Sequence, residues 1–299
     1  MPGENRKPRN LKLDLVLLYS KAYDRCLGVR RLNSTLLFDA GGLGDLQVLL
    51  EDTERALCRG RRVDLGGGPA SVLIVFPAVE HPPSAVLDRF AHEYGLRDEL
   101  DNAWAARPLE LAREGGHTFL LLDDPGGEPL ELLIDGPMET GRFLRLAIGI
   151  AAALGKVHQR NLVHKDLKPA NIIVNCADGR ARLIGFGAAS RLLRERHPPA
   201  PAEIFAGTLA YMAPEQTGRM NRSVDSRSDL YALGVTFYRM LTGRLPFSAD
   251  DPLEWIHCHI ARKPCRAVGG NSGTSLQYRD EAPLKTGRGA LPDCRRPRA

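Results

Sequence analysis

The 299-residue sequence lacks any long uninterrupted hydrophobic run, and this absence excludes an ordinary membrane-spanning helix. Such a helix needs roughly 18 or more consecutive apolar residues. The apolar stretch LKLDLVLLYS near the start is short, carries Lys12 and Asp14, and is not followed by a small-residue cleavage site. The six cysteines form no CxxC pair, which favours free thiols in a reducing compartment. We therefore expect a cytoplasmic protein with no membrane span.

Most of the chain also lacks an excess of charge of either sign. The formal net charge is +5, but residues 260–299 contain 9 Lys/Arg and 3 Asp/Glu, so the rest of the chain is close to neutral. A nucleic-acid-binding surface is typically basic. We therefore expect no nucleic acid partner.

The pattern of apolar residues predicts an α+β protein with two regions of different secondary structure. Short strands and one helix, over 84–100, are expected before about residue 124, and helices over 140–160, 228–243 and 251–261 after it. For the helix over 228–243, Ser228 is the expected N-cap and Gly243 the expected C-terminal stop. In the helix over 140–160 we expect one apolar stripe to face the core, made of Leu144, Ala147, Ile148, Ala151, Leu154 and His158.

The strongest chemical signal is VHKDLKPANIIVN, residues 163–175, on a predicted loop between a helix and a strand. An Asp followed at +2 by Lys and at +5 by Asn suits phosphoryl transfer. Asp166 would accept the proton of an attacking hydroxyl, and Lys168 would neutralise charge on the transferred group. Asn171 would supply an oxygen ligand to Mg²⁺.

Within this stretch, HKDLKPAN resembles the catalytic loop of Ser/Thr protein kinases, with His164 kept and Lys165 in place of the usual Arg. GTLAYMAPE, residues 207–215, resembles the end of the kinase activation segment and contains Thr208 and Glu215. SDLYALGVTFYRMLTGRLPF resembles the helix that follows, whose Asp229 would brace the catalytic loop.

The resemblance implies a bilobal protein-kinase-like fold. We expect an N-terminal extension over 1–40, a degenerate N-lobe over 41–124, an incomplete C-lobe over 125–263 and a basic tail over 264–299. The longer string YMAPEQTGRMNRSVDSRSDLYALG is similar to the kinase-like domain at the front of large bacterial multidomain sensors. The implied cofactors of an active chain are ATP and Mg²⁺. The implied partners are a protein substrate or signalling partner, with ATPase and histidine kinase modules among them.

The departures from the family pattern gather where ATP is held. Gly185, in RLIGFGAAS, stands where the family has the metal-binding Asp of Asp-Phe-Gly, and Val75 stands where it has the ATP-binding Lys. Glu93 is either the usual partner of that Lys or an ordinary surface residue. GGLGDL lacks the third glycine of a phosphate-binding loop, and the better-placed counterpart, residues 50–60, has glycine only at its end.

These losses predict a Ser/Thr kinase-like signalling domain with impaired phosphoryl transfer. Transfer relies on positioning and electrostatic stabilisation, and each missing group weakens one of these. The alternative is a pseudokinase scaffold that binds partners in a bacterial signal-transduction protein. A third possibility is a non-functional fragment of a larger protein.

The tail after Pro264 has no apolar periodicity, which is typical of a disordered basic extension. A second hypothesis is a frameshift. When one allowed codon set for residues 279–296 is shifted by one base, it encodes VMKLLSKRAEERYQTAAG, which resembles the last helices of a kinase. On this hypothesis the chain is truncated, Glu215 lacks its usual Arg partner, and the C-lobe exposes part of its core.

Overall fold

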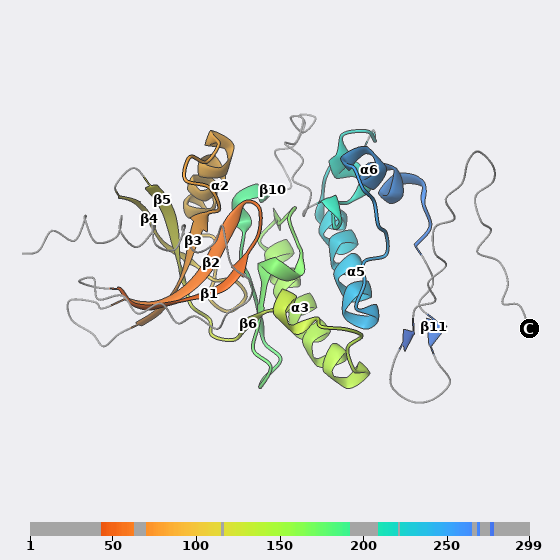
Figure 1. Ribbon diagram of the computed structural model, residues 1–299, viewed down its shortest axis with the longest axis horizontal. Coiled ribbons are helices and arrows are strands. Elements are labelled where there is room, and N and C mark those ends of the chain that lie inside the picture. The colour runs from red at the N-terminus through yellow and green to blue at the C-terminus, as the bar shows by residue number, and fades with distance from the viewer. Residues whose placement is uncertain are drawn as a thin grey trace, which may run out of the picture.

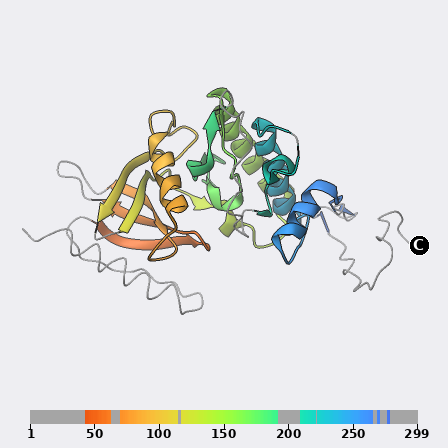
Figure 2. The same ribbon diagram turned by 90° about the horizontal axis from the view of Figure 1, so that it is seen from above.

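The computed structural model describes the backbone of residues 43–62, 70–114, 117–191, 209–220, 222–264, 268–269 and 276–277. The expected extension over 1–40, Thr208 and nearly all of the tail lie outside the described residues, so expectations about them stay predictions. A sheet-rich part and a helical part lie side by side along the long axis (Figures 1 and 2).

The sheet-rich part is a five-stranded antiparallel sheet with the strand order β1-β2-β3-β5-β4. Its strands are β1 (Leu43–Glu51), β2 (Arg55–Arg62), β3 (Ala70–Pro77), β4 (Pro108–Glu114) and β5 (His117–Asp123). The sequence reading missed β4, an edge strand in which polar residues interrupt the apolar pattern. The predicted first helix forms as α2 (Ser84–Gly95), and its Val86 and Phe90 pack with Leu57 and Val75 of the sheet.

The helical part is built around α3 (Thr140–Gln159), α5 (Ser226–Thr242) and α6 (Pro252–Ala261). Among the described residues, none of the helices is long and apolar enough to cross a membrane. Short elements connect the helices: β6 (Glu128–Pro129), η1 (Leu130–Leu133), β7 (Leu162–Val163), η2 (Pro169–Asn171), β8 (Ile172–Val174), β9 (Ala181–Leu183), η3 (Phe186–Ala188), β10 (Ser190–Arg191) and η4 (Pro214–Thr217). The tail contributes one pair of two-residue strands, β11 (Val268–Gly269) and β12 (Leu276–Gln277).

The predicted buried stripe of α3 is confirmed only at Ala147 and Leu154 and is wrong at its exposed members. Leu144 and Ile148 are 51% and 70% exposed, and Ala151 also faces solvent. The buried face instead consists of Leu146, Ala147, Ile150, Ala153, Leu154 and Val157. The helix carries apolar residues on two sides, so three- and four-residue spacing alone does not select the side that packs. Leu230 on α5 and Leu253 on α6 are also exposed.

The predicted start of α5 is also wrong, whereas its end is confirmed. The N-cap is Asp225, whose carboxylate accepts a hydrogen bond from the Arg227 amide at 2.8 Å. Ser228 lies inside the helix, fully buried, and its hydroxyl donates to the Glu215 carboxylate at 2.6 Å. Gly243 ends the helix with φ of 72°, a left-handed conformation that glycine adopts without strain.

Candidate active site

The loop between β7 and η2 is held in place by the buried carboxylate of Asp229. Asp229 on α5 is 1% exposed and accepts hydrogen bonds from the backbone amides of His164 and Lys165, both at 2.8 Å. His158 on α3 contacts the same carboxylate at 2.9 Å. Because both backbone amides point at one side chain, the loop is tied to α5 immediately before Asp166.

His164 links this loop to the segment after β9. Its ring is fully buried, its Nε2 lies 3.0 Å from the Ile184 carbonyl oxygen, and it packs on the ring of Phe186 with centroids 4.6 Å apart. Phe186 is itself fully buried and also contacts Trp104 edge-on. Phe186 of RLIGFGAAS is therefore part of the core and lies directly beside His164 of the catalytic loop.

Asp166, Lys168 and Asn171 lie together, as the sequence predicted. The Asn171 amide donates to the Asp166 carboxylate at 2.9 Å and to its backbone carbonyl at 2.6 Å. The Lys168 ammonium lies 3.4 Å from the same carboxylate. Burial alone would raise the pKa of Asp166, but the charges of Lys168, Arg55 and His164 and the hydrogen bond from Asn171 together hold that pKa below its usual value. The carboxylate is therefore ionised near neutral pH, which a proton acceptor requires.

Gly185 occupies a tight position against Asn171. It has φ of +80°, and a Cβ built there would lie 2.9 Å from the Cγ, Nδ2 and Oδ1 atoms of Asn171. Its amide donates to the Glu93 carboxylate at 2.9 Å. The residue therefore contributes a backbone donor to the site, and the space beside it is already filled.

Glu93 on α2 is 5% exposed, so the hypothesis of an ordinary surface residue is wrong. Burial raises the pKa of this carboxyl, and the charge of Arg55 and the amides of Phe186 and Gly185 offset only part of that rise. Val75 is 2% exposed and packs in the apolar cluster beneath α2. The Glu93 carboxylate therefore pairs with the backbone amide of Gly185, 92 residues away.

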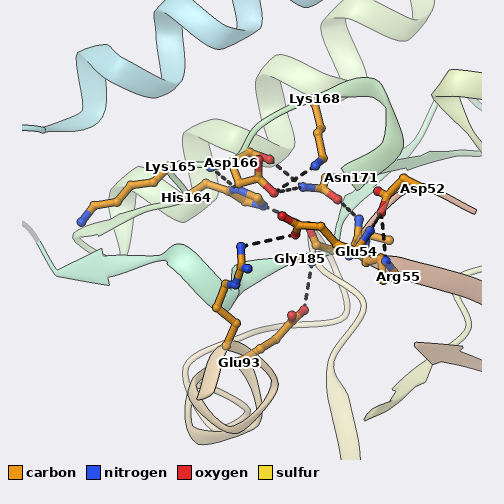
Figure 3. Close-up of polar contacts among 12 residues, drawn as sticks. Asp52, Glu54, Arg55, Glu93, His164, Lys165, Asp166, Lys168, Asn171 and Gly185 are labelled. Carbon is orange, nitrogen blue, oxygen red and sulfur yellow. Dashed lines mark hydrogen bonds and ion pairs between the residues drawn. The ribbon is translucent and has the colours of Figure 1, made fainter. Parts of the chain in front are cut away.

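Three side chains that the sequence motifs did not indicate come from the turn between β1 and β2 and from the first residue of β2. Figure 3 shows Glu54 and Arg55 beside the catalytic loop, whereas the Asp52 carboxylate accepts hydrogen bonds from the amides of Glu54 and Arg55. Glu54 lies 3.3 Å from Arg89 of α2, and Arg55 donates to the Asn171 side-chain oxygen. These residues lie in the segment 50–60, which the sequence suggested as the counterpart of the glycine-rich loop, and this placement could have indicated that they lie near the site. Nothing in the local sequence indicates which of them reach the other lobe.

The residues present do not fit a divalent cation in the usual place. Position 185 has no carboxylate, and the Asn171 oxygen already accepts a hydrogen bond from Arg55. Within the described part of the chain, no group of three or more His, Cys, Asp or Glu side chains is arranged to hold a metal. Mg²⁺ prefers near-octahedral oxygen coordination with at least one or two carboxylates. One Asp166 oxygen and one Glu54 oxygen are buried without a partner, but Lys168 and Arg89 already neutralise these two groups.

The chain belongs to the protein kinase family: the family model described as "Protein kinase domain" matches residues 84–279. The bilobal α+β kinase fold and the bacterial Ser/Thr class expected from the sequence are thereby confirmed. The match begins at α2 and leaves out β1, β2 and β3. Ser/Thr protein kinases in general use ATP and a divalent cation.

Similar proteins are bacterial Ser/Thr protein kinases. Pkn2 of Myxococcus xanthus is 32% identical over 230 residues, which cover 75% of this chain and 26% of pkn2. PknL of Mycobacterium tuberculosis is 31% identical over 204 residues, covering 68% of this chain and 50% of PknL. PksC of Streptomyces coelicolor is 32% identical over 152 residues, covering 49% of this chain and 27% of PksC. The chain thus spans half or less of the length of these relatives.

Proposed function

We propose that this chain is a Ser/Thr kinase-like signalling domain in which phosphoryl transfer to protein is strongly impaired. Asp166 remains placed to accept a hydroxyl proton and Lys168 to neutralise transferred charge. Asn171 would supply a Mg²⁺ ligand in an active kinase, but here its side-chain oxygen accepts a hydrogen bond from Arg55. The domain would act in the cytoplasm, within a bacterial signalling protein that also carries ATPase and histidine kinase modules.

The packing at Gly185 carries this proposal. The site lacks the carboxylate that would bridge the metal and the phosphates, and the Asn171 side chain fills the space where that carboxylate would begin. Removing one preorganised group that stabilises charge in a transition state costs about 10²–10³ in kcat. Val75 removes a second such group by placing an apolar side chain at the lysine position.

A second candidate function, a pseudokinase scaffold, is favoured by the charges in the cleft. Glu54 pairs with Arg89, and Asp166 pairs with Lys168. These pairs partner two acidic side chains with cations of the chain itself, which favours a structural role for them. Such a domain would act through its surface.

Labelled ATP separates the two candidates. The purified chain is incubated with Mg²⁺, labelled ATP and a general protein substrate, beside Asp166→Asn as the matched control. We expect label incorporation near the background set by Asp166→Asn. Strong incorporation that Asp166→Asn abolishes would refute impaired transfer. An incorporation that is weak but dependent on Asp166 favours the impaired kinase, whereas none, with no nucleotide-induced rise in Tm, favours the scaffold.

A further inference from the structure

Arg55, the first residue of β2, contacts the side chain of Asn171, the candidate metal ligand (Figure 3). Its guanidinium donates to the side-chain oxygen of Asn171, 116 residues further along the chain. This oxygen is the atom that the family resemblance assigns to Mg²⁺. The positive charge at this oxygen is therefore supplied by the chain itself.

The turn that carries Arg55 is built to hold it in this position. The Asp52 carboxylate accepts hydrogen bonds from the amides of Glu54 and Arg55, at 2.8 and 2.9 Å. The Asp52 amide donates in return to the Arg55 carbonyl at 2.9 Å. A turn closed by these three hydrogen bonds fixes the start of β2, so the guanidinium approaches Asn171 from a defined backbone position.

The surroundings of the guanidinium are acidic and come from both lobes. Its charge lowers the pKa of Asp166 in the catalytic loop and partly offsets the raised pKa of Glu93 on α2. Asn171 is fully buried, so its oxygen has little access to water. Arginine stays protonated at every pH the protein meets, so this positive charge is permanent.

We propose that Arg55 takes the place of the divalent cation on Asn171, so that the cleft is organised by a built-in guanidinium and binds no metal there. A metal ion would have to displace the guanidinium from Asn171, and position 185 offers it no carboxylate in exchange. The inference rests on the proposed function, impaired phosphoryl transfer, and offers one physical reason for that impairment.

Mn²⁺ alone, without nucleotide, tests the inference on the full chain. Bound Mn²⁺ is measured by electron paramagnetic resonance, and Tm is measured in Mn²⁺, in Mg²⁺ and in EDTA. The variant is Arg55→Gln, which removes the charge. The matched control is Arg61→Gln, which removes the same charge from an exposed position on the same strand. Arg55→Lys keeps a positive charge at the site.

Wild type, Arg61→Gln and Arg55→Lys are expected to bind no Mn²⁺ saturably and to melt at the same temperature in metal and in EDTA. Arg55→Gln is expected to gain saturable binding, with Tm rising by about 3–6 °C at a Mn²⁺ concentration ten times the dissociation constant. Saturable binding by wild type, or no gain in a folded Arg55→Gln, overturns the inference. If Arg55→Gln does not fold, binding by wild type or Arg55→Lys still overturns it, and its absence in both supports it.

The result is distinct from that of the ATP assay. A wild-type chain that binds Mn²⁺ but transfers no phosphate would overturn the role of Arg55 and leave impaired transfer standing. A chain that binds no Mn²⁺ but phosphorylates through Asp166 would refute impaired transfer and leave the role of Arg55 standing.

Discussion

Restoring the family residue at position 185 is the most direct test of how this site is built. In a site that had lost only a ligand, Gly185→Asp would recover metal binding. Here Gly185 has φ of +80°, and its Cβ would lie 2.9 Å from three side-chain atoms of Asn171. We therefore expect the substitution to destabilise the fold and to leave phosphoryl transfer near background.

The size of the effect follows from two contributions. A residue with a Cβ in the left-handed region costs about 1–2 kcal/mol. Displacing Asn171 weakens its hydrogen bonds to Asp166, at about 1 kcal/mol for each bond affected. The expected loss is about 2–4 kcal/mol, a fall in Tm of roughly 5–15 °C for a domain of this size.

Urea and thermal unfolding of Gly185→Asp and Gly185→Ala measure this loss. Gly185→Ala adds the Cβ without the charge, so it isolates the steric part. The control is Gly155→Ala in α3, where a Cβ meets nothing within 4 Å, and it should stabilise by about 0.5–1 kcal/mol. Gly185→Ala as stable as wild type, or Gly185→Asp that is both stable and active, would refute the reasoning.

Two further substitutions test the support of the catalytic loop. Asp229→Asn should lower the free energy of unfolding in urea by about 1.5–3 kcal/mol, because the buried carboxylate that accepts hydrogen bonds from two backbone amides is lost. The control Asp88→Asn, at an exposed position, should change it by less than about 0.5 kcal/mol. Equal effects of the two substitutions would contradict the role of Asp229 in bracing the loop. Lys165→Met tests whether the Lys165 ammonium titrates at an unusually low pH. Burial lowers the pKa of Lys165 to about 8, and the charge of Asp229 offsets only part of this lowering. The unfolded chain then binds more protons than the folded chain between pH 8 and the usual 10.5, so wild-type stability should rise with pH over this window. Thermal melts of Lys165→Met should lack that rise, and parallel pH profiles would disprove the shift.

The catalytic-loop residues could be read from the sequence because their grouping is local. Asp166, Lys168 and Asn171 fall within six residues, and a single turn between a strand and a 3-10 helix brings their side chains together. The positions of α2, α3, α5 and α6 were likewise readable from apolar spacing and end signals such as Gly243.

Local spacing gave a wrong prediction where two sets of residues of similar chemical character were available. The helix α3 carries one apolar stripe through Leu144 and Ile148 and another through Leu146 and Ile150, and only the second is buried. Hydrophobicity predicts that a stripe packs, but the neighbouring elements decide which one. The same limit explains the misplaced N-cap, because Asp225 and Ser228 are both suitable capping residues.

The sequence by itself determined the family, the catalytic loop and the loss of the carboxylate at Gly185, because each depends on residue identity within a short segment. Only the tertiary structure decided what replaced the missing groups. Arg55 and Asn171 are 116 residues apart, and Glu93 and Gly185 are 92 apart. These contacts form because α2 packs against η3 and the sheet packs with Ile173 and Ile184, and such packing follows from the whole core rather than from any local pattern.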